Sequence, residues 1–427
     1  MTDVLVADDP LYEELYDVRR EAIDAGNLVE EDMMPAMAAL RERGGVHAGK
    51  LRQLLGLPVH DRHALGIGRP HYAALSWAAC EAIFRDPKRF SSRIMHHPAD
   101  GDEQGMGILE MDPPRHRAYR KTLQPMFVPS QTSTWWRERW VHDIVGTLVE
   151  RLQGRATADL NLDYCARIPV HTITRAIGLH GDDALIFRSA MVKSSLNNRG
   201  TAESRKEAGA TVERMLFDLI DKRRAQPEDD LVSALLAQQL KLPDGSSRPL
   251  SDREILINSR LIMLAGGGTT WRQLGITLWA LLTHPDQWEA VRADRSLVSR
   301  AIEEALRWSP TAALFSRSVT EDTELEGVAI PEGSVVEIWL GAANRDPARW
   351  ERPDVYDVHR VPQAHLGFGM GTHHCLGTNV ARSEMSVGIN ALLDAFPSLR
   401  LDPDAPVPCL TGGLETRGVS ALPVLLG

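Results

Sequence analysis

A chain of 427 residues with 43% hydrophobic and 25% charged residues has the composition of a globular protein with a large core, which excludes a disordered chain. The net charge of −10 argues against nucleic-acid binding, and four cysteines are too few for a disulfide framework. The chain has no apolar run long enough to cross a membrane, and its first residues include acids where a signal peptide would be basic and then apolar. We therefore expect a soluble, cytoplasmic protein that binds neither membrane nor nucleic acid.

Apolar residues recur at helical spacing along most of the chain, for example in 140–152 and 212–220. The segments 91–110 and 240–250 have the composition of loops. Short strand-like runs follow at 316–321, at 334–341 and near the C-terminus around 418–426. Neither a repeat nor a linker divides the sequence. The pattern predicts a mainly α fold with a small β region, in a single domain over residues 1–427.

The segment between residues 251 and 284 predicts an unusually long helix. Ser251 and Glu254 form a capping-box pattern, Pro285 follows the segment, and no proline interrupts it, so a helix of roughly 50 Å is possible at about 1.5 Å per residue. Its middle contains Gly266, Gly267 and Gly268, each of which costs up to about 1 kcal/mol relative to alanine. Either two helices meet there through a loop, or one helix narrows so that something bulky can lie against its backbone.

Residues 365–384 read HLGFGMGTHHCLGTNVARSE, a glycine-rich loop that leads through Cys375 into a helical pattern. Amide groups at the start of a helix favour a thiolate, so we expect the thiol pKa of Cys375 to be lowered. Glycines also let a flat ligand approach the chain. The other cysteines, Cys80, Cys165 and Cys409, are expected to be small buried hydrophobic residues.

This loop resembles the haem-binding loop of the cytochrome P450 family. The match includes Ala381, Arg382 and Glu384 after the loop, and within it the positions Phe368, Gly369, Gly371, His373, Cys375 and Gly377. The resemblance implies the cytochrome P450 fold and haem b, with Cys375 as the ligand of the iron. It also implies that the haem is contacted from this loop by Phe368, Gly369, His373 and Gly377.

Other parts of the chain resemble the same family at suitable positions. Glu304 and Arg307 match its ExxR pattern, three residues apart on one helical face, and Arg360 ends a segment similar to its FDxxR pattern. The resemblance implies that these three residues form a structural brace behind the cysteine loop. An ExxR pattern by itself is more often a solvated surface pair.

His116 and Arg120 resemble the family's HxxxR pattern, and Arg317 occupies the position of its third contact to the haem propionates. The alternative is a solvated basic helix face, which explains Arg115, Arg117 and Lys121 better than it explains the matched pair. Together with Arg137 and Arg139, those extra bases suggest a local positive surface for an acidic redox partner.

The glycine segment LAGGGTT resembles the distal helix of the family. Ala265 and Gly266 would pass over the haem, and Thr269, followed by Thr270, would lie beside bound oxygen. The family's usual acid is replaced by Gly268, which cannot act as a general acid. Water could carry the protons, the substrate could supply a polar group, or the enzyme could use peroxide. We favour water or substrate. For Thr269 itself, a bond to the carbonyl four residues back is the simpler reading.

The resemblance implies a monooxygenase that hydroxylates a small molecule with O2 and electrons from NAD(P)H through a separate ferredoxin and ferredoxin reductase. Apolar residues in the segments that would line the pocket favour a hydrophobic substrate. These segments are 91–110, 187–200, 261–270, 312–315 and Leu414. His96 and His97 in the first segment could touch the substrate, but we favour mobile surface histidines. The alternatives are a peroxide-driven peroxygenase, a haem-binding protein without turnover, and a cysteine hydrolase in which His373 or His374 assists Cys375.

Overall fold

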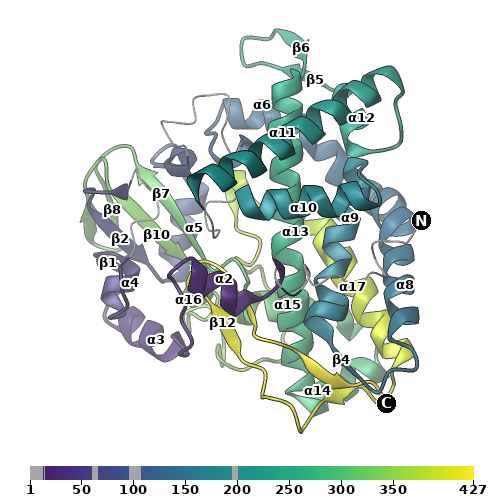
Figure 1. Cartoon of the computed structure of the whole chain (residues 1–427). Coiled ribbons are helices and arrows are strands. Elements are labelled where there is room, and N and C mark those ends of the chain that lie inside the picture. The colour runs from purple at the N-terminus through teal and green to yellow at the C-terminus, as the bar shows by residue number, and fades with distance from the viewer. Residues whose placement is uncertain (1–12, 14, 60–65, 96–106, 195–200) are drawn as a thin grey trace.

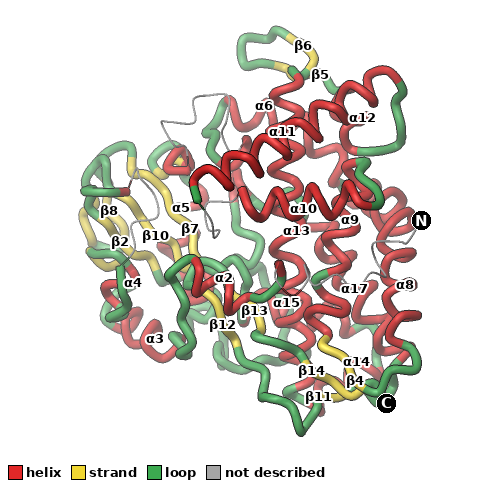
Figure 2. Tube along the Cα trace, in the orientation of Figure 1, coloured by secondary structure: helices red, strands yellow, loops and turns green. Residues whose placement is uncertain are grey.

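The computed structural model describes residues 13, 15–59, 66–95, 107–194 and 201–427. It is mainly α with a small β region, as predicted (Figures 1 and 2). The α-helices are α2 (Val18–Asp24), α3 (Met34–Glu42), α4 (Leu51–Leu54), α5 (Trp77–Arg85), α6 (Arg115–Leu123), α7 (Pro129–Gln131), α8 (His142–Leu152), α9 (Arg167–Ile177), α10 (Asp182–Ser194), α11 (Ala202–Ala225), α12 (Leu231–Leu236), α13 (Asp252–Leu282), α14 (Pro285–Ala293), α15 (Leu297–Trp308), α16 (Leu340–Ala343) and α17 (Thr378–Ala395).

The strands are short and follow in the same numbering. They are β1 (Val46–Ala48), β2 (His71–Ala74), β3 (Phe90–Ser91), β4 (Thr157–Asp159), β5 (Gln239–Lys241), β6 (Ser247–Pro249), β7 (Leu314–Val319), β8 (Thr323–Leu325), β9 (Val328–Ile330), β10 (Val335–Trp339), β11 (Arg400–Leu401), β12 (Leu410–Gly412), β13 (Arg417–Val419) and β14 (Pro423–Leu425). The strand-like runs predicted near 316–321, 334–341 and the C-terminus correspond to β7, β10, β13 and β14.

The long segment forms one continuous helix, α13, so the alternative of two helices joined by a loop is wrong. Ser251 and Glu254 make both bonds of the predicted capping box. The helix runs through the centre of the molecule with α10 and α11 crossing over it (Figure 1). Neighbours such as α9, α15 and α17 cover most of its sides. That tertiary packing offsets the cost of the three glycines, because helical stability in proteins comes largely from burial.

A five-stranded sheet stands beside the helical part, in the order β1, β2, β10, β7, β3. Strand β10 is parallel to β2 and antiparallel to β7. It reads VVEIW and is buried at four of its five positions, as expected for the central strand of a covered sheet. Arg317 lies on β7 opposite Val336 of β10, so the sheet fixes its place in the molecule.

The segment 240–250 is not a loop, as the composition suggested, but a β-hairpin of β5 and β6. Its turn was recognisable in the sequence from Gly245, and in the structure this residue has a φ of 89°, which favours glycine. The strands were not, because the side chains of β6 are all exposed and show no alternation of apolar and polar residues. The hairpin extends away from the body of the molecule at the top of Figure 1.

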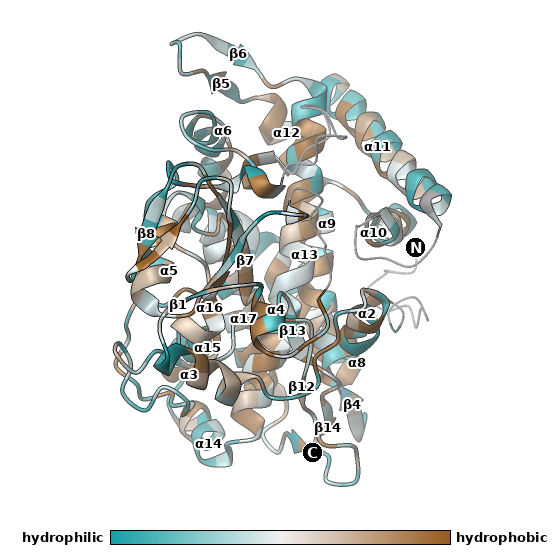
Figure 3. Ribbon diagram, turned by 90° about the vertical axis from the view of Figure 1, so that its left-hand side faces the viewer, coloured by the Kyte–Doolittle hydropathy of each residue, from teal (hydrophilic) through white to brown (hydrophobic). Residues whose placement is uncertain are grey.

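Buried side chains form three hydrophobic clusters. One joins the helices around α13, one lies between the sheet and α5, and the smallest includes Leu414 with parts of α3 and β2. In Figure 3 the peripheral helix α11 alternates between hydrophilic and hydrophobic colours along its length. Such alternation is typical of a surface helix with one face on the core. Among the described residues, no helix is both long and apolar enough to cross a membrane.

Candidate functional site

The loop before α17 holds Cys375 through its own backbone. The N–H of Cys375 donates to the carbonyl of Phe368 at 2.9 Å, and the N–H of Leu366 donates to the buried Asn344 side chain at 2.7 Å. Gly371 has a φ of 70°, and a Cβ there would lie 2.2 Å from the carbonyl oxygen of Phe84. A residue with a side chain is therefore excluded at position 371. The loop is folded so that Cys375 stands just before the start of α17.

The thiol of Cys375 does not have the lowered pKa that its position before a helix predicted. Burial raises the pKa of the thiol, because the surrounding protein displaces much of the water around the sulfur. Part of the residue nevertheless remains exposed. The backbone of Gly377, the Thr378 side chain and the charge of Arg120 act in the opposite direction. Desolvation is larger than these effects. Coordination to a metal cation would deprotonate the thiol outright.

Glu304 joins two arginines behind the loop. Arg307 donates from Nε and Nη2 at 2.8 Å to the two carboxylate oxygens of Glu304, and Arg360 donates from Nε at 3.0 Å. The remaining guanidinium nitrogens bond backbone carbonyls, including those of Asn344 and Pro353. Glu304 and Arg307 are buried, so the reading as a solvated surface pair is wrong. A guanidinium fork suits this simultaneous binding of a carboxylate and carbonyls.

A second carboxylate beside the brace was missed in the sequence. Glu303 accepts hydrogen bonds from Arg382 at 2.6 and 2.7 Å and from His365 at 3.1 Å. Desolvation alone would raise the pKa of Glu303, but these bonds outweigh it and lower the pKa to about 2. The guanidinium of Arg382 lies 4.8 Å from the centre of the Phe368 ring. Glu303 therefore ties the first helical turns of α17 and the loop residue Phe368 to α15.

Four nitrogen-bearing residues gather near Cys375, and we call them the nitrogen cluster: His116, Arg120, Arg317 and His373. The rings of His116 and His373 are 4.2 Å apart, and both arginines are electrostatic neighbours of His373. Burial lowers the pKa of His116 to about 4 and that of His373 to about 3, so both rings are neutral. Burial also lowers the pKa of Arg317 to about 10.

The nitrogen cluster has too few acceptors among the described residues. Both ring nitrogens of His116 are buried and have no hydrogen-bond partner there, while Arg317 donates to the Ser316 carbonyl and Arg120 donates to Gln124. Buried polar groups normally have partners. An anionic ligand at this place would supply them. With Cys375 as a soft donor, these residues fit a metal cofactor that carries carboxylates, as haem does.

The middle of α13 has an exposed side although the helix is otherwise enclosed. Ala265 is exposed, Gly266, Gly268 and Thr269 are partly exposed, and Thr270 is buried. The Thr269 hydroxyl donates to the carbonyl of Ala265 at 2.9 Å. The simpler reading of this hydroxyl, a bond within the helix, is therefore present in the structure. The exposed side gives a ligand access to the helix backbone at Ala265 and Gly266.

Several other expectations need correction. Leu414 and Ala313 are buried in the third hydrophobic cluster, so they do not line a pocket, whereas Phe315 is 38% exposed. Cys409 is exposed, in contrast to Cys80 and Cys165. Arg139 pairs with Asp229, which reduces the positive surface expected there, while Arg115, Arg117 and Lys121 on α6 are exposed. His96 and His97 lie outside the described residues.

Comparison with known proteins extends the match beyond these motifs. The model of the family described as Cytochrome P450 matches residues 186–416. Vitamin D3 dihydroxylase of Streptomyces griseolus is 34% identical over 376 residues, which are 86% of this chain and 90% of the relative. The 6-deoxyerythronolide B hydroxylase of Saccharopolyspora erythraea is 34% identical over 315 residues, covering 74% of this chain and 76% of the relative.

The solved structure of the bacillaene polyketide synthase cytochrome P450 PksS from Bacillus subtilis 168 has a TM-score of 0.81 to this chain. Its sequence is 26% identical, and the match covers 93% of this chain and 97% of that one. Fold and sequence agree over most of the molecule, so this chain belongs to the cytochrome P450 family, whose members are haem-iron oxygenases.

Proposed function

We propose that this protein is a haem-thiolate monooxygenase that contains haem b and hydroxylates a hydrophobic small molecule with O2. The observation that carries the proposal is the nitrogen cluster beside Cys375, in which both buried ring nitrogens of His116 lack a hydrogen-bond partner within the described part of the chain. A haem held by the Cys375 thiolate would supply the activation of O2, so that, with two electrons and two protons, one oxygen atom would enter a C–H bond of the substrate and the other would leave as water. The cysteine hydrolase is disfavoured, because burial lowers the pKa of His373 to about 3, which makes it a weak base for Cys375, and its Nε2 bonds Ser92 at 3.0 Å.

The residues of this chain have separate tasks in the proposal. Cys375 is the iron ligand, and Glu304, Arg307 and Arg360 keep its loop in place. The haem propionates are bound by His116, Arg120 and Arg317, with His373 beside them. The haem is further contacted by Phe368, Gly369, Gly377, Ala265 and Gly266. Thr269, which lies between Gly268 and Thr270, would position O2 and hold a proton on the side of the site formed by α13.

A large apolar metabolite is the substrate class that we propose. The names of the two sequence relatives refer to vitamin D3 and to 6-deoxyerythronolide B. In this chain, Leu264 and Ala265 are not fully buried, and Ile173 lies 3.4 Å from the position that a Cβ of Gly266 would occupy. Apolar side chains at this part of α13 suit a ligand of that kind.

Electrons reach the protein, in our proposal, from NAD(P)H through a separate ferredoxin and its reductase. The exposed bases of α6, Arg115, Arg117 and Lys121, favour an acidic carrier. We also propose a cytoplasmic location. All four cysteines, which lie within the described residues, are free thiols, as is usual in a reducing compartment.

The decisive experiment compares wild type with Cys375→Ser, using Cys409→Ser as the matched control. The reduced carbon monoxide complex should show the red-shifted thiolate band in wild type and in the control, and should lack it in Cys375→Ser. Apolar compounds are then screened for a Soret shift. Compounds that bind are tested for product with NADPH, ferredoxin and reductase, or with peroxide alone. Product with peroxide but none with the redox partners would replace the proposal by a peroxygenase. Binding without product by either route would leave a haem-binding protein.

A further inference from the structure

The N-terminal helix α2 lies against the middle of α13, far from it in the sequence. Tyr16, just before α2, meets Trp271 edge to face at a ring distance of 5.6 Å. Glu21 of α2 forms an ion pair with Arg272 of α13. Strands β12 and β13 both contact α2, and β13 also contacts α13. Figures 1 and 3 both show α2 next to this part of the molecule.

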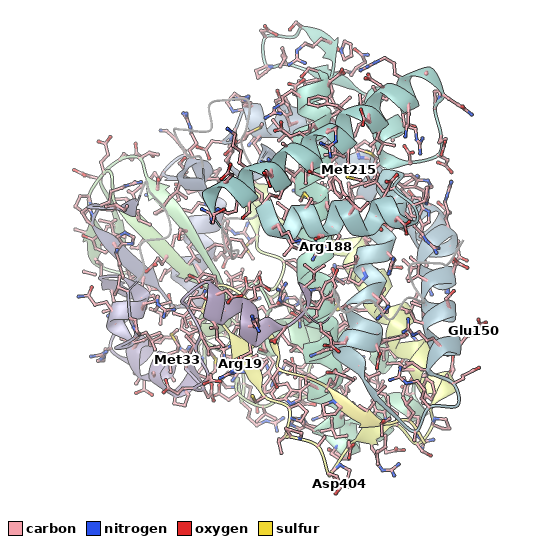
Figure 4. The ribbon with its side chains drawn as sticks, viewed as in Figure 1. Arg19, Met33, Glu150, Arg188, Met215 and Asp404 are labelled. Carbon is pink, nitrogen blue, oxygen red and sulfur yellow. The ribbon has the colours of Figure 1, made fainter. Side chains whose placement is uncertain are left out.

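Two arginines reach the carbonyls of consecutive glycines in α13. Arg272 donates from Nη1 to the carbonyl of Gly268 at 2.5 Å. Arg188, labelled in Figure 4, extends from α10 and donates from Nη2 to the carbonyl of Gly267 at 3.4 Å. A Cβ at Gly267 would stand 3.0 Å from Nη1 of Arg188. At position 267, the lack of a side chain therefore lets a guanidinium approach the helix backbone.

The segment with α2 provides the partners of both arginines. Arg188 donates from Nε to the hydroxyl of Tyr16 at 3.1 Å, while Arg272 bonds the carboxylate of Glu21. The side chain of Arg272 is only 8% exposed, and the side chain of Glu21 is 46% exposed. A buried guanidinium without a counter-charge is strongly unfavourable. Glu21 therefore allows Arg272 to keep its place at the Gly268 carbonyl.

A small polar cavity adjoins this ion pair. Its lining includes Glu21, Arg272, Asn27, Glu415 and Thr416. Nε of Arg272 and Oδ1 of Asn27 are buried and have no partner among the described residues. The cavity thus lies beside the guanidinium that bonds the Gly268 carbonyl, and its lining joins residues of α2 to Arg272 of α13.

We propose that Glu21 is a positioning residue for the distal side of the site. It acts through Arg272, which holds the peptide carbonyl of Gly268. Position 268 of α13 has no carboxylate of its own, and the carboxylate of Glu21 on α2 acts on this part of the helix through Arg272. Because Gly268 precedes Thr269, the ion pair also fixes the backbone that carries the Thr269 hydroxyl. This inference rests on the proposed monooxygenase function and adds a residue from outside the matched motifs.

The test compares Glu21→Gln with Glu21→Asp, and uses Glu30→Gln as the matched control. Glu30 forms a surface ion pair with Arg19 in the same part of the chain. With ferredoxin, reductase and a substrate found by the Soret screen, Glu21→Gln should reduce product per NADPH by about tenfold to a hundredfold, the range for a misplaced site. Released peroxide should rise in parallel. Glu21→Asp should recover most of the product, and Glu30→Gln should resemble wild type.

Product formation driven by added peroxide separates positioning from general damage. Peroxide brings its own protons and electrons, so the peroxide-driven rate of Glu21→Gln should stay within about twofold of the wild-type rate. A factor of two corresponds to a few tenths of a kcal/mol in the activation barrier. An equal loss by both routes would mean a merely structural role and would overturn the proposal. So would a Glu21→Gln enzyme that behaves like Glu30→Gln.

Hydrogen exchange of the holoprotein gives a readout that does not depend on turnover. Amides of α13 around residues 265–272 should exchange faster in Glu21→Gln than in Glu30→Gln. In the background Arg272→Gln, the further change Glu21→Gln should have no effect, because the two residues act as a pair. Unchanged exchange, or effects that simply add, would contradict the inference. A wild-type protein without ferredoxin-driven turnover would instead contradict the proposed function, and the exchange result would still decide whether α2 holds α13.

Discussion

The carboxylate of Glu304 accepts hydrogen bonds from two guanidinium groups and from the N–H of Asp357, all in the interior behind Cys375. Three groups of this network were recognisable from the motifs, because the family resemblance fixes their spacing. The ion pair of Arg272 was not, since its partner Glu21 is 251 residues away and has no motif around it. The exposure of Cys409 was also missed, because a lone cysteine carries no signal about its surroundings.

Glu304→Gln should lower the free energy of unfolding by about 3–5 kcal/mol, because two charged arginines would lose their shared counter-charge inside the protein. We also expect less bound haem, measured by absorbance, since the brace supports the cysteine loop. Glu289→Gln is the control, as Glu289 pairs with Arg292 at the surface and should change stability by less than about 1 kcal/mol. Denaturant unfolding measures both variants. Equal effects would show that the brace adds nothing to stability.

Glu384 gives a pH prediction. Burial raises the pKa of its carboxyl to about 8, against a hydrogen bond with Thr172 that lowers it. Between its ordinary pKa of 4.5 and pH 8, the unfolded chain has released this proton and the native protein keeps it. The contribution to stability is complete below the ordinary value and is lost as pH rises toward 8, by up to about 1.4 kcal/mol per pH unit. Glu384→Gln should remove this slope in unfolding measurements from pH 5 to 8. Parallel curves for the two proteins would refute it.

Helix α13 combines a strong cap, a mostly buried surface and a glycine-rich middle. The cap was predictable from Ser251 and Glu254, and the continuity of the helix was one of two readings. The sequence could not distinguish the two readings. Local helix propensity includes the destabilising effect of the three glycines but not the packing of α9, α15 and α17, which offsets it. The hairpin of β5 and β6 was missed for the opposite reason, as its exposed strands bury too little to leave a pattern.

Substitution by alanine should change the free energy of unfolding differently at Gly267 and Gly268 of α13. Among the described residues, a Cβ at Gly268 would meet only Nη1 of Arg272, at 3.6 Å, so Gly268→Ala should raise the free energy of unfolding by up to about 1 kcal/mol. At Gly267 a Cβ would stand 3.0 Å from Arg188, which would have to move, so Gly267→Ala should gain less or lose stability. Denaturant unfolding of the two variants measures this, and an equal gain in both would show that Arg188 does not contact the helix.

At the scale of the molecule, the helical part and the sheet share the site. The sheet contributes Arg317 through β7, while helices contribute His116, Arg120 and Thr269. The mainly α composition with a small β region was predictable from apolar spacing. The order of the strands was not, because β2 and β10 pair across more than 250 residues of intervening chain.

A single domain over residues 1–427 stays a prediction, and we expect the holoprotein to unfold in one cooperative transition. Near-ultraviolet circular dichroism, tryptophan fluorescence and haem absorbance should then give the same midpoint in denaturant, as two-state unfolding requires. Limited proteolysis should leave no stable fragment that corresponds to the sheet alone. Separate midpoints for near-ultraviolet circular dichroism and tryptophan fluorescence would indicate more than one unit.

The docking of α2 has a consequence for how the protein is made. Its partner Arg272 follows Glu21 by 251 residues, and the bond of Asn27 to Glu415 joins residues 388 positions apart. At roughly 5–20 residues per second, the ribosome needs on the order of 20–80 s to add those 388 residues. During that time α2 has no completed surface to bind. This part of the site is therefore completed only after the residues around Glu415 have joined those around Glu21 and Asn27.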